Sequence, residues 1–292
     1  ERIPVSENPK RDMVSENPNL TSLLPVRHPQ QDLFICDIAD CVLKNDIASM
    51  EHPVFSLSKK PDLSVREYVN GDKRLTVTPS VKGMATIYDK DILIFAISQL
   101  MAAKNQGEPI SRELRLSARS FLVFANRHTG GGDYEQLEAA LDRLTGTRLK
   151  TSIRTGGEKQ DSWFGLVESA YVKRLENADG SEGRVMEMRI TLSDWLFKAI
   201  TANEVLSMHP DYFRLRKPIE RRLYEIARKH CGAQDRWEVR LDLLHKKTGS
   251  RSPVKQFRYF LKELEGQQHL PDYMVEIRES GDYVTFTRRG SN

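Results

Sequence analysis

The chain has 292 residues, of which 39% are hydrophobic and 29% charged, proportions typical of a globular protein with a packed core. Its length is sufficient for two domains, and its three cysteines are too few and too scattered for a disulfide framework. No apolar run reaches the roughly 18 residues that a membrane span requires, and the first residues lack a signal-peptide pattern. We therefore expect a cytoplasmic protein that does not contact a membrane.

The first part of the chain predicts a tail followed by short extended runs. Residues 1–22 are polar and contain Glu-Asn-Pro twice, at 7–9 and 16–18. Helical spacing of apolar residues predicts a helix over 33–48. Extended runs at 54–57, 64–69 and 74–78 follow, with the hairpin signal Asn70-Gly71-Asp72 between the last two. These runs predict a small antiparallel sheet ahead of the next domain.

The segment from Asp89 to Thr191 predicts helix, strand, helix, turn, helix and hairpin, in that order. A broad apolar stripe indicates the first helix, and Ser117 and Asp133 are candidate N-caps of the other two. The predicted elements are a helix over 89–104, a strand over 110–116, helices from 117 and from 133 to 146, and extended runs over 147–154, 162–174 and 185–191. Ser193 is predicted to cap a further helix.

The last part of the chain predicts the same order of elements. They are a helix over 218–231, a strand over 237–241, a short helix over 242–249, a helix capped by Ser252 with Pro253 at its first position, and a hairpin of 273–278 and 283–287. This order is that of a winged helix-turn-helix. Leu137, Leu141 and Leu144 also align with Phe257, Leu261 and Leu264 at a constant offset of 120 residues. The sequence therefore indicates a duplicated architecture.

We predict an α+β fold of two tandem winged-helix domains, with a short N-terminal extension and a small antiparallel sheet. The expected divisions are a polar tail over 1–22, an N-terminal winged-helix domain with its extension over 23–200, and a C-terminal winged-helix DNA-binding domain over 201–292. Asp211 to Leu215 leads into the helix at 218 without a flexible linker. Coupled halves are therefore expected.

Positive charge is concentrated between Arg214 and Lys262. This segment has fifteen Lys or Arg and five Asp or Glu, a net charge of +10, whereas the whole chain carries +4 and the remainder therefore −6. Such a concentration is the electrostatic footprint of a phosphate-binding surface, although a solvated basic face without a polyanion partner remains the alternative. The helix after Asp133 carries Glu135, Glu138 and Asp142 against one Arg143, so this half should contact DNA less or make protein contacts instead.

The helix that begins near Ser252 is the predicted recognition helix, with its N-terminal half in the major groove. Base-edge contacts are expected from Ser252, Lys255, Gln256 and Tyr259, with Arg258 nearby. Phosphate contacts are expected from Lys246, Lys247, Arg251, Lys262, Arg288 and Arg289. Backbone contacts of the N-terminal half are expected from Arg127, Arg148, Lys150, Arg154 and Lys159.

The sequence lacks the motifs of the common enzyme classes. The glycines at 130–132 are not followed by the lysine of a phosphate-binding loop, and the seven histidines stand singly. Cys36 and Cys41 have no nearby Cys or His pair to complete a zinc site, and no nucleophile elbow presents a serine. We expect no catalytic residue, no metal and no cofactor.

Four stretches carry a resemblance to a known family. They are Leu-Pro-Val-Arg-His-Pro-Gln-Gln-Asp-Leu-Phe-Ile at 24–35, Met-Glu-His-Pro-Val-Phe-Ser-Leu-Ser-Lys-Lys at 50–60, Thr-Pro-Ser-Val-Lys-Gly-Met-Ala-Thr-Ile-Tyr-Asp-Lys-Asp-Ile-Leu at 78–93, and Leu-Arg-Lys-Pro-Ile-Glu-Arg-Arg-Leu-Tyr-Glu-Ile-Ala-Arg-Lys at 215–229. Over roughly 23–289 the chain resembles plasmid replication initiator proteins of the replication initiator A type. The resemblance implies binding of double-stranded origin DNA, often at repeated sites, then melting and recruitment of the host replicative helicase.

More distantly, the duplicated plan is similar to that of iteron-binding initiators. In these the C-terminal unit reads the repeat, while the N-terminal unit assists and often dimerises. The resemblance thus implies a host initiator as a further partner and a possible homodimer through the N-terminal winged helix. Two rival functions remain open: a transcriptional regulator or autorepressor that binds a promoter palindrome, and an architectural or partner-binding protein.

Overall fold

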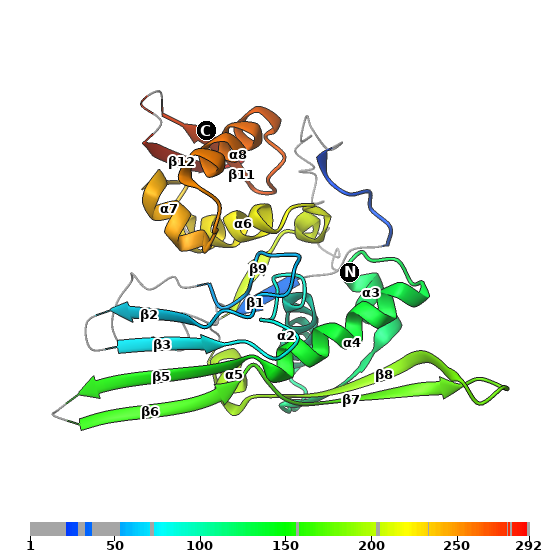
Figure 1. Ribbon diagram of the computed structural model, residues 1–292. Coiled ribbons are helices and arrows are strands. Elements are labelled where there is room, and N and C mark those ends of the chain that lie inside the picture. The colour runs from blue at the N-terminus through cyan, green and yellow to red at the C-terminus, as the bar shows by residue number, and fades with distance from the viewer. Residues whose placement is uncertain are drawn as a thin grey trace, which may run out of the picture.

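Helices and small antiparallel sheets alternate along the chain, and two parts of it repeat one order of elements (Figure 1). The computed structural model describes residues 22–28, 33–36, 53–70, 73–155, 158–202, 205–232, 234–278, 280 and 282–290. The N-terminal unit consists of α2 (Lys90–Asn105), β4 (Glu113–Ser117), α3 (Ala118–Phe124), α4 (Gly131–Gly146), β7 (Val167–Glu176) and β8 (Glu182–Leu192). The C-terminal unit consists of α6 (Pro218–Cys231), β10 (Arg236–Arg240), α7 (Leu241–Thr248), α8 (Val254–Gln267), β11 (Tyr273–Ile277) and β12 (Tyr283–Arg288).

The three-stranded sheets of the two units have the same topology. The strand orders are β4-β8-β7 and β10-β12-β11, so in each unit the last strand of the hairpin pairs with the strand before the helix pair. All of these pairings are antiparallel. The aligned triplets, Leu137, Leu141 and Leu144 on α4 and Phe257, Leu261 and Leu264 on α8, are all buried. The repeated order of elements predicted from the sequence is therefore present.

Helix starts follow the predicted caps in some places and not in others. The Ser117 and Ser193 side chains accept hydrogen bonds from the backbone of Ser120 and Leu196, as predicted for N-caps of α3 and of α5 (Asp194–Thr201). Helix α4 instead begins after Gly130, which places Asp133 in its first turn beside the positive end of the helix dipole.

The predicted cap of the last helix is wrong by one residue. Helix α8 begins at Val254, with Pro253 in the capping position and no side-chain cap. The Ser252 hydroxyl lies 2.8 Å from the Ser250 hydroxyl and closes the preceding turn instead. Since proline has no N–H and fixes its own φ, it can stand at this boundary without leaving a donor unsatisfied.

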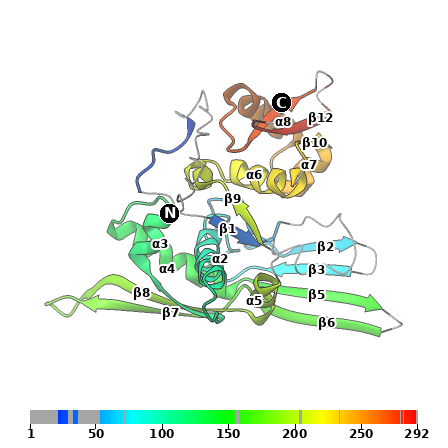
Figure 2. The same cartoon turned by 180° about the vertical axis from the view of Figure 1, so that it is seen from behind.

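The early extended runs do not form a separate sheet, which corrects the prediction. β2 (Arg66–Asn70) and β3 (Lys73–Thr78) join β5 (Arg148–Thr155) and β6 (Glu158–Gly165) in one sheet of order β2-β3-β5-β6. The run predicted over 162–174 is divided at the buried Leu166, where the chain passes from this sheet into β7. The four-stranded sheet and the β7–β8 hairpin extend in opposite directions from the N-terminal helices (Figure 2). The run at 54–57 contributes one isolated bridge, between Ser56 and Thr86.

The helix predicted over 33–48 is wrong for its first residues. β1 (Leu33–Cys36) pairs antiparallel with β9 (Val205–Met208), with Leu33 opposite Met208 and Cys36 opposite Val205. A strand partner so distant in sequence supplies backbone hydrogen bonds that local periodicity cannot indicate. Residues 37–48 lie outside the described residues.

One apolar cluster runs through both units, joined by aromatic side chains of the connecting 3-10 helix η2 (Pro210–Arg214). Phe213 lies edge-on to Phe124 at 5.3 Å between ring centroids, and Tyr212 lies 5.8 Å from Tyr224 of α6. Burial raises the pKa of both tyrosines well above the ordinary value, so their hydroxyls stay protonated. The Tyr212 hydroxyl lies 2.7 Å from the Glu225 carboxylate. No helix in the described part of the chain has the length and apolarity needed to cross a bilayer.

Candidate nucleic-acid interface

The α7–α8 turn of the C-terminal unit is fixed from two sides. His245 of α7 lies 2.8 Å from the Ser252 carbonyl, and its ring packs 4.9 Å from that of Phe257. Gly249 ends α7 in the left-handed region, at φ +69°, and a Cβ there would lie 2.1 Å from Pro53. Only glycine meets both conditions, because other residues are strained at this φ and would collide with the proline ring. The turn that presents α8 is therefore held against the N-terminal part of the chain.

The outward face of α8 combines cations with groups that can read base edges. Lys255, Gln256, Tyr259 and Lys262 are exposed, and Tyr259 reaches 72%. Phe257, Leu261 and Leu264 on the opposite face are buried, so they orient the helix rather than contact a ligand. Arg258 lies 3.8 Å from Asp282, in the turn of the β11–β12 hairpin, and so connects the helix with the hairpin. The structure brings these five predicted residues together on one surface.

The predicted phosphate contacts divide into exposed and buried groups. Lys246 and Arg288 are exposed, as is Arg251, which also lies 3.3 Å from Asp62. Burial alone would raise the pKa of Asp62, but hydrogen bonds from Ser64 and Arg66 lower it to about 2. Asp62 is therefore a permanent anion that holds Arg251 near the α7–α8 turn.

Two of the predicted phosphate contacts are not available in this structure. Lys247 is buried at 8% exposure, with its ammonium nitrogen 3.5 Å from His230 of α6. Arg289 is half-buried and donates to the backbone carbonyls of Leu270 and Gln268. Burial lowers the pKa of Arg289. Both cations stabilise the C-terminal unit from within, so we leave them out of the interface.

Four of the predicted contacts of the N-terminal half, Arg148, Lys150, Arg154 and Lys159, lie on the four-stranded sheet. Arg148, Lys150 and Arg154 occupy alternate positions of β5, of which Arg148 is exposed and Lys150 half-buried. The Lys150 ammonium lies 3.6 Å from Asp161 and 4.7 Å from the centroid of the Trp163 ring. Lys159 lies 3.1 Å from Asp161. Nothing is described of the Arg154 side chain.

Helix α4 presents a surface of the opposite kind. Glu135 is exposed, Glu138 pairs with Arg174, and Asp142 pairs with Lys82. Arg143, the one cation that the sequence placed against these acids, forms two hydrogen bonds of 2.7 Å with Asp89. These hydrogen bonds raise the pKa of Arg143. The surface of α4 is therefore acidic, as its sequence indicates, and acids beside phosphates are unfavourable.

The junction between the units contains a charged cluster that sequence reasoning missed. Asp91 of α2 is fully buried and accepts hydrogen bonds of 2.8 Å from Arg127 and from Arg221 of α6. Burial alone would lower the pKa of Arg221, but the charge of Asp91 raises it above its usual value. Arg127 is therefore not the backbone contact that was expected. No local signal marks this pairing, because its residues come together only in the fold.

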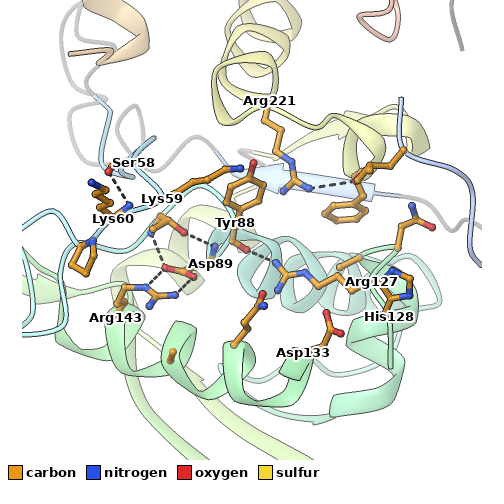
Figure 3. A pocket seen from close by; sticks show the side chains of 18 of the residues that line it. Ser58, Lys59, Lys60, Tyr88, Asp89, Arg127, His128, Asp133, Arg143 and Arg221 are labelled. Carbon is orange, nitrogen blue, oxygen red and sulfur yellow. Dashed lines mark hydrogen bonds and ion pairs between the residues drawn. The ribbon is translucent and has the colours of Figure 1, made fainter. Parts of the chain in front are cut away.

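A cavity of about 610 Å³ lies beside this junction. Figure 3 shows Tyr88, Asp89, Arg127, Arg143 and Arg221 around it, with the Arg143 guanidinium held by Asp89. Because both units line it, the cavity depends on their packing against each other. Three of the cations at its walls, Arg127, Arg143 and Arg221, are paired with Asp89 or Asp91 and are therefore structural.

Comparisons with known proteins identify the family of the chain. A family model described as replication initiator protein A matches residues 44–275. A putative replication protein of Wigglesworthia glossinidia brevipalpis is 38% identical over 262 residues, which cover 89% of this chain and 94% of that protein.

Solved structures of domains 2 and 3 of RctB share the fold. One structure has a TM-score of 0.60 and 14% sequence identity, and the match covers 81% of this chain and 94% of that one. The other has a TM-score of 0.55 and 13% identity, and the match covers 80% of this chain and 94% of that one. At these identities the likeness concerns the fold alone. The family model and the bacterial relative each cover most of the sequence, and the chain therefore belongs to the replication initiator protein A family.

Proposed function

We propose that this chain initiates plasmid replication by binding double-stranded origin DNA through two tandem winged-helix domains. The observation that carries the proposal is the outward face of α8, where two lysines, a glutamine and a tyrosine stand exposed above a buried apolar stripe. An amphipathic helix of this composition suits the major groove. The proposed domains are an N-terminal one over 23–200, after a polar tail over 1–22, and a C-terminal one over 201–292.

Residues of α8 and its flanks have separate roles in this proposal. Lys255, Gln256 and Tyr259 approach base edges, together with Ser252 in the turn before the helix and Arg258 beside the hairpin. Lys246, Arg251, Lys262 and Arg288 bind phosphates on either side of the groove. The division follows general geometry, since long exposed cations at the margins reach the backbone while side chains at the front of the helix reach the bases.

The N-terminal domain assists rather than reads the sequence. Its helix α4 is acidic, so DNA contacts come from the cations of β5, Arg148, Lys150 and Arg154, and the same domain supplies a homodimer contact. The host replicative helicase and the host initiator are the proposed protein partners, in the cytoplasm. No catalytic step is required, because the free energy of binding to repeated sites can itself favour opening of adjacent A·T-rich DNA.

Footprinting of the purified chain on its own plasmid's origin tests this proposal, with a chemical probe for unpaired bases in the same samples. Protection of several direct repeats, with reactive bases in a neighbouring A·T-rich stretch, is the expected result. Protection of a single palindrome without melting would favour a transcriptional regulator. If no sequence is specifically protected, the basic C-terminal segment is a general polyanion surface and the assignment of α8 fails.

A further inference from the structure

The outer face of the β2-β3-β5-β6 sheet carries an exposed tryptophan among basic side chains. Trp163 of β6 is 62% exposed, whereas Trp195 and Trp237 are partly buried. Lys150 of β5 stands directly opposite Trp163, with its ammonium over the indole ring. A large aromatic left in solvent beside a cation is typical of a contact surface for a ligand that has both planar groups and negative charge.

The strand register places further cations on the same face. Directly opposed residues in an antiparallel sheet project to the same side, and alternate residues along each strand share it. Arg74 stands opposite Ser152 of β5, Arg148 opposite Gly165 of β6, and Lys159 two positions along β6 from Asp161. We call this surface the basic sheet face; its members are Arg74, Arg148, Lys150, Lys159 and Trp163.

The two faces of this sheet differ sharply. On the other side Leu75, Val77 and Leu149 are fully buried, and Phe164 stacks on Trp195 at 5.0 Å. Two acids lie on the same side of the sheet as the basic sheet face. They are Asp161, which pairs with Lys150 and Lys159, and Glu67 of the edge strand β2. The cations of the basic sheet face nevertheless outnumber these acids, and Arg148 lies across Gly165, where no side chain blocks it.

We infer that the basic sheet face binds single-stranded DNA. Trp163 stacks on an unpaired base, while Arg148, Lys150 and Arg74 follow the sugar-phosphate backbone across the strands. Sheet surfaces that combine aromatic stacking with a cationic track bind single strands with little dependence on sequence, since every base has a planar face. The inference rests on the proposed function, because an initiator that melts its origin exposes such a strand, and holding it would keep the duplex open.

The sheet is too wide to enter the major groove of duplex DNA, so its β5 cations reach only the phosphates of a duplex. Four strands at a spacing of about 4.8 Å span about 14 Å before side chains are added, and the major groove, about 12 Å wide, admits a helix or a two-stranded ribbon. Stacking on Trp163 also requires a base that has left its own stack. The surface therefore complements the C-terminal unit, whose helix suits the intact groove.

The opposite hairpin supplies a matched control. Tyr171 of β7 is 56% exposed and has the Arg189 guanidinium 5.7 Å from its ring centroid. It thus resembles Trp163 in exposure and in having a cation over the ring, but it lies on the three-stranded sheet β4-β8-β7. Replacement of Tyr171 should leave binding of single strands unchanged.

The experiment measures fluorescence anisotropy of a labelled oligothymidylate with the full chain and its Trp163→Ala, Trp163→Phe and Tyr171→Ala variants. We expect Trp163→Ala to weaken binding by about 5- to 100-fold. Trp163→Phe should weaken it less, since a smaller ring still stacks, yet should abolish the quenching of intrinsic fluorescence by the oligonucleotide. Lys150→Gln should lower the salt dependence of single-strand binding, and the Trp163 and Tyr171 variants should keep their affinity for the duplex origin.

Several outcomes would overturn the inference. The inference would be wrong if wild type and Trp163→Ala bound oligothymidylate with equal affinity. It would also be wrong if Tyr171→Ala lost as much of this affinity as Trp163→Ala. Competition by polyglutamate as effective as that by oligothymidylate would identify a surface for an acidic protein. Dissociation of a dimer by Trp163→Ala, with single-strand affinity unchanged, would identify an interface between copies of this chain. The proposed function is tested separately, by footprinting of the duplex origin. If no specific protection were found there, the oligothymidylate measurement would still test the inference about the basic sheet face.

Discussion

Helices α4 and α8 occupy the same place in two units of identical topology, yet their surfaces are opposite in charge. At the offset of 120 residues that aligns their buried triplets, Glu135, Glu138 and Asp142 stand where Lys255, Arg258 and Lys262 stand on α8. The apolar positions coincide because both helices must cover a three-stranded sheet. The fold is thus repeated while the exposed positions diverge, which teaches that the topology of these units alone does not say which of them meets DNA.

The largest effect is expected where the two units are joined. Asp91→Ala removes the carboxylate that Arg127 and Arg221 share and leaves a buried guanidinium without this charge partner. Removal of one member of a buried ion pair costs about 3–5 kcal/mol. Urea unfolding of the full chain should show this loss.

The exposed pair Asp194–Lys198, with its atoms 2.6 Å apart, provides the matched control. Asp194→Ala should change the free energy of unfolding by about 0.5 kcal/mol or less, because solvent already screens this pair. If Asp91→Ala destabilised the chain no more than Asp194→Ala, the junction would not couple the units, and α4 and α8 would belong to independently folding parts.

The contrast between the two helices becomes sharpest at one pair of identical residues. Gln256 of α8 aligns with Gln136 of α4, and both side chains are exposed. Gln256→Ala should reduce the preference for the origin over random DNA by about 1–3 kcal/mol, because a base contact is lost. Gln136→Ala should leave that preference unchanged. Equal effects in a competition binding assay would contradict the assignment of sequence reading to α8.

Local signals were sufficient for much of the fold. The apolar stripe of α2, the Ser117 and Ser193 caps and the bounds of α6 could be predicted, because helices are specified by residues within a few turns. The pairing of β1 with β9 and the addition of β2 and β3 to β5 could not, since each depends on strands far away in sequence. The Asp91–Arg221 contact was hidden for the same reason.

The candidate site shows the same limit within a single dipeptide. Lys246 and Lys247 are equivalent in sequence, but successive residues of a helix point about 100° apart. The position of α6 decides that Lys247 turns inward against His230 while Lys246 remains in solvent. Predicting the interface therefore required the packing of α7 on α6. The number of charged residues in a segment does not show which of their side chains are buried.

This pair yields a prediction with a moderate effect. Lys246→Ala should weaken binding to specific and random DNA similarly and reduce the slope of log affinity against log salt by about 0.9, because one phosphate contact is lost. Lys247→Ala should leave that slope unchanged and instead lower the free energy of unfolding. Titrations at several salt concentrations, with urea unfolding of both variants, distinguish the two lysines. A lower slope for Lys247→Ala would return this residue to the interface.

The smallest effect is expected at the start of α8, and it concerns how the two units build their helices. Ser117→Ala removes the hydroxyl that caps α3 of the N-terminal unit and should cost about 1 kcal/mol of stability. Ser252→Ala removes a hydroxyl that lies 2.8 Å from the Ser250 hydroxyl and does not cap α8, so stability should change by about 0.5 kcal/mol or less. Since Ser252 faces the proposed groove, its loss should appear in origin binding instead. A full capping penalty for Ser252→Ala in thermal unfolding would show that α8 depends on this side chain after all, as α3 depends on Ser117.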